Sequence, residues 1–238
     1  MSVPNTPMKL TPLYPIAQCL GAEFTEQRRW RIPEVYTTRE AEIAAARSGV
    51  VLADESPNGK LTVEGAQAGA ILNAAFDPDL PSLAINAGAV VGPNRIYCLR
   101  GDLFFVSTPP SSENAARKKL TTAIEGSGDF VTVTDMTHGR AEIRIIGPAC
   151  QAMLSKVCGL DFHPVEFPDG TAKQSSVVKT TQLIIRRDIG ELPAFSIIGA
   201  QSLGAYVWNT IMEAGHEWGL APIGRAAIEA LGENWPVG

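Results

Sequence analysis

The chain has 238 residues, of which 45% are hydrophobic and 19% are charged, and its formal net charge is −5. These values are typical of a folded globular protein and argue against a disordered chain, which combines few apolar residues with high net charge. The acidic balance and the lack of a dense Lys/Arg stripe argue against a nucleic-acid-binding protein.

The cysteines and the N-terminal sequence bear on metal binding and location. The four cysteines contain no CxxC pair and the chain has three histidines, so no metal site is expected. The first 15 residues are interrupted by prolines and lack the apolar stretch of a signal peptide. No run approaches the roughly 20 apolar residues of a membrane span. We therefore expect a cytoplasmic protein with no membrane partner.

The first segment, residues 1–36, is predicted to be an irregular N-terminal arm. Its prolines at positions 4, 7, 12, 15 and 33 deny it long helices. A helix is predicted to start at Thr37, which has capping-box spacing to Glu40, and to stop at Gly49.

Two stretches share a pattern of strand, glycine and helix. In each, alternating apolar residues predict a half-buried strand, and a helix is predicted after the glycine. Adding 82 maps Leu61 to Ile143, Val63 to Ile145, Gly65 to Gly147, Ala70 to Ala152 and Leu72 to Leu154. This repeat favours two similar halves, residues 37–130 and 131–238.

The remaining segments are predicted to be short strands and two longer helices. The predicted strands are residues 50–52, 95–99, 103–106, 175–179, 183–187 and 194–198. One helix is predicted from Ser111 or Ser112 to Ile124, and another from Ser202 along an apolar stripe to Trp218. The tight turns favour a mainly antiparallel α+β sandwich over a doubly wound parallel sheet.

Motifs in order along the chain resemble the glycine-cleavage aminomethyltransferases. The resemblance is carried by Thr11-Pro12-Leu13-Tyr14, Asp54-Glu55-Ser56-Pro57-Asn58-Gly59-Lys60-Leu61 and Gly219-Leu220-Ala221-Pro222-Ile223-Gly224. The middle is more similar to the gamma subunit of heterotetrameric sarcosine oxidase, in Gly101-Asp102-Leu103-Phe104-Phe105, Cys158-Gly159-Leu160-Asp161 and Ser202-Leu203-Gly204-Ala205-Tyr206. Together these motifs span nearly the whole chain.

The resemblance implies an α+β fold. It has two ferredoxin-like halves whose mainly antiparallel sheets surround a central channel that holds tetrahydrofolate. Full-length aminomethyltransferases add a C-terminal β-barrel after this unit. The sequence ends at Gly238, so the protein is expected to lack that barrel, as the gamma subunit does.

The resemblance also implies where folate would bind. The family uses an Asp-Asp pair for one-carbon transfer; here Asn94 and Arg95 stand in its place, so no catalytic residue is assigned. The expected folate contacts are Glu191, Asn94, Tyr97, Asp54 and Ser56. Glu191 as a solvated loop residue and Asp54 as a turn cap remain open as alternatives. The arginines of a family helix near Ile228 are also missing.

Three functions follow as hypotheses. The leading one is a tetrahydrofolate-type accessory subunit of a demethylating amine oxidase, in which only a larger flavoprotein partner holds flavin. The second is a stand-alone tetrahydrofolate-dependent aminomethyltransferase. The third is a non-catalytic scaffold relative that has lost folate binding.

Overall fold

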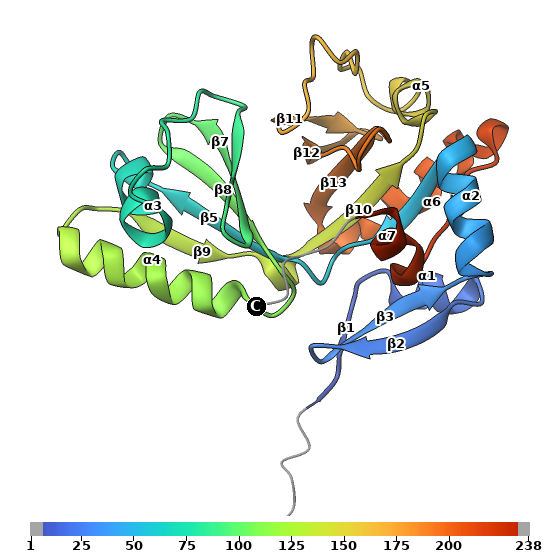
Figure 1. Ribbon diagram of the computed structural model, residues 1–238, viewed down its shortest axis with the longest axis horizontal. Helices are drawn as coiled ribbons and strands as arrows, with labels where there is room; N and C mark the ends of the chain where they lie inside the picture. The colour runs from blue at the N-terminus through green and yellow to red at the C-terminus, as the bar shows by residue number, and fades with distance from the viewer. Residues whose placement is uncertain (1–6, 233–238) are drawn as a thin grey trace, which may run out of the picture.

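The structure is a computed structural model that describes residues 7–232. Two lobes, each built on a β-sheet with helices on its outer side, stand opposite each other, and a small sheet lies below one of them (Figure 1). The described strands form sheets of three, five and six strands, which are mostly antiparallel and do not close into a barrel. The predicted α+β class with mainly antiparallel sheets is confirmed.

The N-terminal region is regular, which corrects the expected irregular arm. Its elements are β1 (Lys9–Leu10), α1 (Tyr14–Cys19), β2 (Glu23–Gln27) and β3 (Trp30–Val35), and the strands pair in the order β1-β3-β2. Its prolines sit where regular structure tolerates them. Pro15 lies in the first turn of α1, and Pro33 lies beyond the β1 pairing, beside a bulge opposite Phe24. Buried Leu13 and Trp30 tie this region to the fold.

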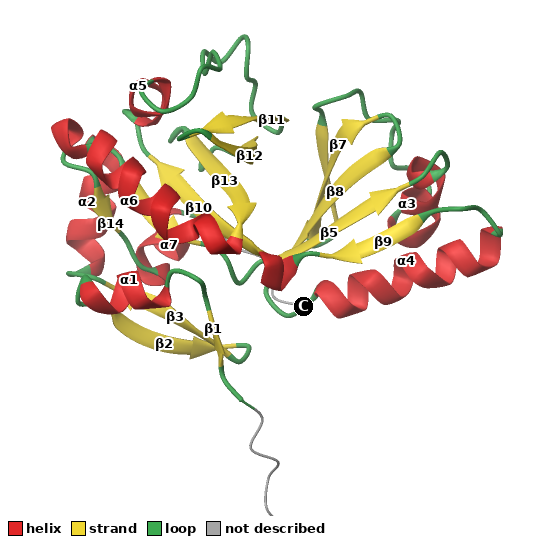
Figure 2. Ribbon diagram, turned by 180° about the vertical axis from the view of Figure 1, so that it is seen from behind, coloured by secondary structure: helices red, strands yellow, loops and turns green. Residues whose placement is uncertain are grey.

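The five-stranded sheet forms one lobe. Its strands, in spatial order, are β6 (Gly88–Val91), β7 (Asn94–Arg100), β8 (Leu103–Thr108), β5 (Gly59–Glu64) and β9 (Thr132–Asp135). Helices α3 (Ala68–Phe76) and α4 (Glu113–Ser127) cover its outer face (Figure 2). Leu61, Val63, Leu72 and Leu120 are fully buried in the core between sheet and helices.

The six-stranded sheet forms the other lobe. Its strands, in spatial order, are β11 (Ala172–Val177), β12 (Thr180–Arg186), β13 (Ala194–Ala200), β10 (Arg140–Ile146), β4 (Val51–Asp54) and β14 (Ala221–Pro222). One face packs on α5 (Cys150–Ser155) and α6 (Gly204–Ala214) through a core that includes Ile143 and Ile145. Neighbouring strand residues point to opposite faces. Accordingly, Val51 and Ile146 pack on the other side, against α2 (Arg39–Ser48) and α7 (Arg225–Leu231).

The two large sheets repeat one arrangement, as the sequence pattern predicted. β5 and β10 occupy matching places, each followed by a glycine and a helix and then by a hairpin. Gly65 and Gly147 both have positive φ, 150° and 128°, where a Cβ would collide with backbone oxygens at 2.6 and 2.4 Å. The sheets do not divide at residue 130, because β4 joins the second sheet and β9 joins the first.

Two predicted helix starts shift along the chain. The cap of α2 is Thr38 rather than Thr37, because the Thr38 hydroxyl accepts a hydrogen bond from the backbone N–H of Ala41 at 3.2 Å. The second helix begins as the 3₁₀ turn Gln201–Leu203 and becomes α-helical at Gly204. Two further 3₁₀ turns are Thr137–Gly139 and His216–Trp218.

A buried carboxylate fastens α2 to two other elements. Glu42 is 3% exposed and accepts backbone N–H bonds from Tyr36 at 2.5 Å, Thr37 at 3.0 Å and Gly224 at 2.8 Å. One side chain thereby joins the end of β3, the start of α2 and the start of α7.

Candidate functional site

Buried charged side chains lie between the two large sheets. On β5 and β10, the residues that alternate with the outer core point toward the opposite sheet, and they include Lys60, Glu142 and Arg144. We call the complete set the inner charged layer; its members are Glu55, Lys60, Arg95, Glu142, Arg144 and Arg187. Buried charged side chains in proteins are usually paired with opposite charges. Ion pairs are therefore expected within this layer.

One ion pair crosses from sheet to sheet. Lys60 Nζ on β5 lies 2.9 Å from Glu142 Oε2 on β10, and the two side chains are 0% and 3% exposed. Lys60 Nζ also donates to the backbone oxygens of Asn58 at 2.7 Å and Ser56 at 3.2 Å. Burial acts to raise the pKa of Glu142, but Lys60, Arg187 and Ser196 together hold that pKa below its usual value.

A second group places arginines around one carboxylate. Glu55 Oε2 lies 3.1 Å from Arg187 Nη2 and 3.9 Å from Arg144 Nε, and Arg144 Nη2 also donates to the backbone oxygen of Arg187. Burial, together with Arg144, lowers the pKa of Arg187 to about 10, so the guanidinium stays charged at neutral pH. Burial also lowers the pKa of Arg95, which acts electrostatically on Arg144 and Arg187.

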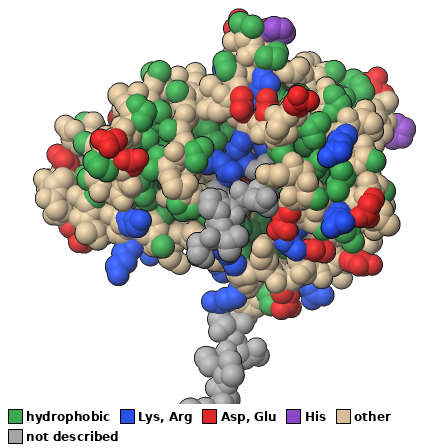
Figure 3. All heavy atoms as spheres, viewed as in Figure 1, with side chains coloured by type: hydrophobic (Ala, Val, Ile, Leu, Met, Phe, Trp, Pro, Cys, Tyr) green, Lys and Arg blue, Asp and Glu red, His purple; other side chains and the backbone are tan. Residues whose placement is uncertain are grey.

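The layer is cationic. Its six described members supply four cations and two carboxylates, a net charge of +2. Basic side chains are visible in the hollow between the lobes (Figure 3). Beside the layer, apolar residues from both sheets, among them Tyr97, Phe105 and Leu183, form a separate buried cluster. This cluster keeps water from one side of the charges and so strengthens their interactions.

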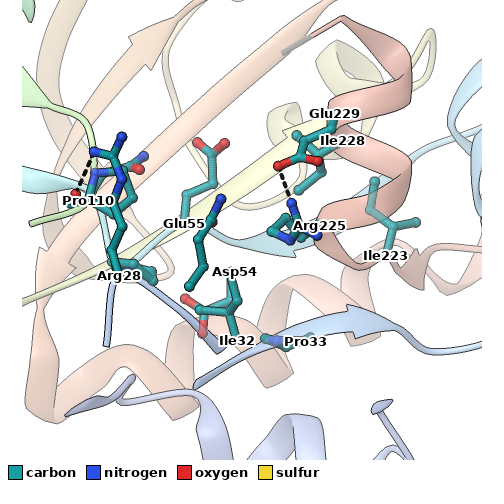
Figure 4. Close-up of a pocket in the computed structure, with 13 residues that line it drawn as sticks. Arg28, Ile32, Pro33, Asp54, Glu55, Pro110, Ile223, Arg225, Ile228 and Glu229 are labelled. Atoms are coloured by element: carbon teal, nitrogen blue, oxygen red, sulfur yellow. Dashed lines mark hydrogen bonds and ion pairs between the residues drawn. The ribbon is translucent and has the colours of Figure 1, made fainter. Parts of the chain in front are cut away.

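A cavity of about 360 Å³ opens next to the layer. Its wall comes from β3, from the turn after β4, from Pro110 and from α7 (Figure 4). Glu55 and Asp54 lie side by side on this wall with their carboxylates pointing in different directions (Figure 4). Arg225 faces the cavity from α7, where it pairs with Glu34 at 2.8 Å and with Glu229.

Asp54 lies in the cavity wall at the end of β4. Its Oδ1 accepts a hydrogen bond from the backbone N–H of Ser56 at 3.0 Å, and its Oδ2 is buried. Burial raises the pKa of Asp54, although Ser56 and Lys60 act in the opposite direction. Ser56 itself accepts from the backbone N–H of Glu142 at 3.1 Å, so this turn is attached to β10.

The structure brings together some of the residues predicted to contact folate. Asp54 and Ser56 share the turn beside the cavity. Asn94 and Tyr97 are buried on β7, and burial raises the pKa of Tyr97 against the opposing effect of Arg187. Glu191 is exposed in the turn between Ile189 and Leu192 and does not line the cavity. Its role as a folate contact stays a prediction.

Sequence reasoning missed most of the inner charged layer. The sequence patterns place Arg144, Arg187 and Glu142 only within strands, and Glu55 only within a motif. One signal was present, since Arg140, Glu142 and Arg144 alternate with apolar residues on β10. Alternating charges usually mark a solvated strand face, and only the pairing of the sheets shows that this face is buried.

Residues 7–232 hold neither a metal-binding cluster nor a membrane-spanning helix. No three His, Cys, Asp or Glu side chains in that range are arranged to hold a metal ion. No helix within it is long and apolar enough to cross a membrane. The described cysteines are free thiols, and Cys98, Cys150 and Cys158 are buried.

Sequence comparison identifies relatives over nearly the whole chain. The aminomethyltransferase of Halothermothrix orenii is 26% identical over 236 residues, which cover 94% of this chain and 64% of the relative. The aminomethyltransferase of Symbiobacterium thermophilum is 27% identical over 241 residues, which cover 95% of this chain and 64% of the relative. The chain therefore spans less than two thirds of the length of these relatives.

Two solved structures share the fold. The glycine cleavage system aminomethyltransferase T of Bartonella henselae superimposes with a TM-score of 0.81 and 21% identity, covering 94% of this chain and 62% of that one. A chain of the heterotetrameric sarcosine oxidase of Corynebacterium sp. U-96, in complex with pyrrole 2-carboxylate, superimposes with a TM-score of 0.66 and 21% identity. This match covers 87% of the present chain and 95% of that one. The family model described as the GCVT N-terminal domain matches residues 13–232. The chain thus belongs to this aminomethyltransferase-like, folate-binding superfamily.

Proposed function

We propose that this protein is an accessory subunit of a demethylating amine oxidase, similar to the gamma subunit of sarcosine oxidase, and acts in cytoplasmic one-carbon metabolism. A larger flavoprotein partner holds the flavin and carries out the oxidation. The observation that carries the proposal is the presence of an arginine at position 95. This residue, together with Arg144 and Arg187, makes the layer between the sheets cationic, and the resemblance expects a carboxylate at its position.

The charge matters because methylene transfer to tetrahydrofolate develops positive charge on the one-carbon unit. A carboxylate stabilises such a charge, whereas a guanidinium opposes it. At 4 Å and an effective dielectric constant of 20, two like charges repel by about 4 kcal/mol, which corresponds to roughly a thousandfold in rate.

Tetrahydrofolate is the ligand that the family implies, and the described residues fit its pterin ring poorly. The acid expected to hold the ring, Glu191, is exposed outside the cavity. The two carboxylates of the inner charged layer that could accept hydrogen bonds from an amino-pyrimidine edge, Glu55 and Glu142, are already paired with Arg187 and Lys60. The fold shared with a chain of a heterotetrameric sarcosine oxidase supports the subunit role.

Co-purification tests the proposal. The full chain, tagged and expressed in its native host, is expected to elute with a larger polypeptide that carries flavin absorbance in a fixed ratio. The complex is expected to oxidise an N-methyl amine, with sarcosine as the probe. A tagged chain that elutes alone and without flavin at native expression level contradicts the proposal.

The second candidate is a stand-alone aminomethyltransferase, favoured by the names of the relatives that cover 94% of the chain. It predicts that the isolated chain binds tetrahydrofolate and transfers a one-carbon unit, and that Asp54→Asn abolishes the transfer. Calorimetric titration with tetrahydrofolate separates the candidates further. A scaffold without ligand gives no heat, and a transferase gives a saturable isotherm.

A further inference from the structure

The turn between β2 and β3 has a backbone conformation that is unfavourable for its residues. Arg28 and Arg29 have φ angles of 48° and 69°, in the left-handed region that residues other than glycine rarely adopt. A two-residue hairpin turn with this backbone is usually Asn-Gly. Strained backbone of this kind is concentrated at ligand clamps and switch regions. The contacts of the Arg28 side chain indicate that this turn has such a role.

Arg28 reaches the loop between β8 and α4, which belongs to the opposite lobe. Its Nη1 donates hydrogen bonds to the backbone oxygen of Pro110 at 3.0 Å and to Ser112 Oγ at 3.3 Å. In return, the hydroxyl of Ser111 donates to the backbone oxygen of Arg28 at 2.9 Å. We call these three hydrogen bonds the clasp. Ser111 has a φ of 62°, so both residues that donate in the clasp have left-handed backbone.

The clasp forms part of the cavity wall. Arg28 and Pro110 both line the cavity, and the hydrogen bond between them lies at one side of it (Figure 4). Arg28 belongs to the N-terminal sheet, which is attached to the second lobe where Glu34 on β3 pairs with Arg225 on α7 at 2.8 Å. Residues 109–112 follow β8 and belong to the first lobe. Hydrogen bonds between two parts of the molecule therefore close the cavity at this side.

The clasp differs from the buried contact between the lobes. Its donors, Arg28 and Ser111, are exposed residues, so water can replace each partner when a bond breaks. Ser112 precedes α4, but its side chain does not cap the helix, and breaking the clasp therefore leaves α4 intact. The Lys60–Glu142 ion pair, by contrast, is buried and keeps the two large sheets together.

We propose that the clasp is a gate for the cavity. Water replaces its hydrogen bonds, residues 109–112 move away from Arg28, and a small molecule enters between them. Release also frees Ser111 from its left-handed backbone, which favours opening. When the bonds form again, the wall closes around a cavity of about 360 Å³, which accommodates a small metabolite. The gate does not depend on the accessory-subunit role.

Thiol labelling measures the opening of the gate on the full chain. Ile228→Cys places a thiol on the cavity wall, at a position on α7 that is 8% exposed. Iodoacetamide is the probe, and mass spectrometry reads each cysteine separately. Where closing is faster than labelling, the labelling rate follows the fraction of molecules in the open form. The introduced thiol is expected to react more slowly than the exposed Cys19.

The native buried thiols report unfolding in the same sample. Cys98, Cys150 and Cys158 are buried, so they react when the protein opens as a whole. The introduced thiol is expected to react faster than these three, because the gate opens without unfolding the cores. An introduced thiol that reacts as fast as Cys19 means that the cavity stands open, and one that reacts only as slowly as the buried thiols means that the gate does not open. Either result overturns the proposal.

A double serine variant weakens the clasp without changing the cavity wall. Ser111→Ala/Ser112→Ala removes two hydroxyl groups of the clasp and keeps Arg28; neither serine is among the described residues that line the cavity. In the Ile228→Cys background, labelling at position 228 is expected to become about tenfold faster, since two hydrogen bonds are lost. The buried native thiols are expected to keep their rates.

The matched control is Ser127→Ala, which removes a hydroxyl at the other end of α4. That hydroxyl donates to the backbone oxygen of Ile124 at 3.1 Å, outside the clasp, and its loss is expected to leave labelling at position 228 unchanged. An unchanged rate in the double serine variant overturns the gate. So does a rise at position 228 that is matched at Cys98, Cys150 and Cys158, because it shows opening of the whole protein.

Discussion

The two faces of β5 and β10 differ in kind although they belong to the same strands. Toward the helices, Leu61 and Ile145 are fully buried in apolar cores. Toward the opposite sheet, Lys60, Glu142 and Arg144 are just as buried and charged. Well-packed apolar residues are often as stabilising as a buried ion pair, or more so. The inner face therefore carries groups that the fold alone does not require, which directs attention to binding.

The largest expected effect on stability comes from removing one partner of the ion pair that joins the two sheets. Lys60→Met is expected to destabilise the protein by about 3–5 kcal/mol, because Glu142 stays buried without its cation. Urea unfolding at pH 7 measures the loss.

The matched control is the double variant Lys60→Met/Glu142→Leu, which removes both charges. It is expected to recover most of the lost stability. In the native protein, the stability that this ion pair contributes is fully present above the ordinary glutamate pKa of 4.5. That stability is lost as pH falls through the lowered pKa of Glu142. Without Lys60, burial raises the pKa of Glu142, so the difference in stability between the native protein and Lys60→Met is expected to narrow progressively as pH falls from 8 toward 4. A double variant as unstable as the single one contradicts this explanation.

The outer face responds to volume instead of charge. Ile145→Ala leaves a cavity beneath the helices of the second lobe and is expected to cost about 3 kcal/mol. The loss is expected to be the same at pH 8 and pH 4, since no titratable group is removed. Urea unfolding at the two pH values makes the comparison, and a strongly pH-dependent loss means that the outer core and the charged layer are coupled.

The smallest expected effect is a gain at the cavity wall. Asp54→Asn keeps an acceptor for the N–H of Ser56 and removes a buried charge, so stability at pH 8 is expected to rise by about 1 kcal/mol. The sign follows from the raised pKa of Asp54. Its charge costs stability above that pKa, and the cost disappears as pH falls toward the ordinary value of 3.8. Urea unfolding is thus expected to show the gain in stability at pH 8 and no gain near pH 4. An equal gain at both pH values contradicts the explanation that the charge of Asp54 costs stability.

The sequence predicts one face of the fold well and the other poorly. Alternation identifies Leu61, Val63, Ile143 and Ile145 as core, because apolar burial is a local pattern along each strand. It cannot identify the inner charged layer, since Lys60 and Glu142 meet only when two sheets pack together. The same limit applies to the N-terminal region, where Pro15 and Pro33 sit at positions that regular structure tolerates and Trp30 is buried.

The site is predictable only in part. The resemblance directs attention to Asp54, Ser56 and Arg95, which the structure places at the cavity or in the layer. It does not direct attention to Arg187, which reaches Glu55 across 132 positions of sequence. Such a pairing leaves no trace in local spacing.

One-carbon transfer by the isolated chain tests most directly whether the cationic layer excludes transferase chemistry. The assay supplies tetrahydrofolate and an aminomethyl donor, and follows the methylene product in single-turnover conditions. We expect no transfer above the uncatalysed rate from the native chain. Transfer by the native chain at rates typical of enzymes, about 1–1000 s⁻¹, contradicts the central claim.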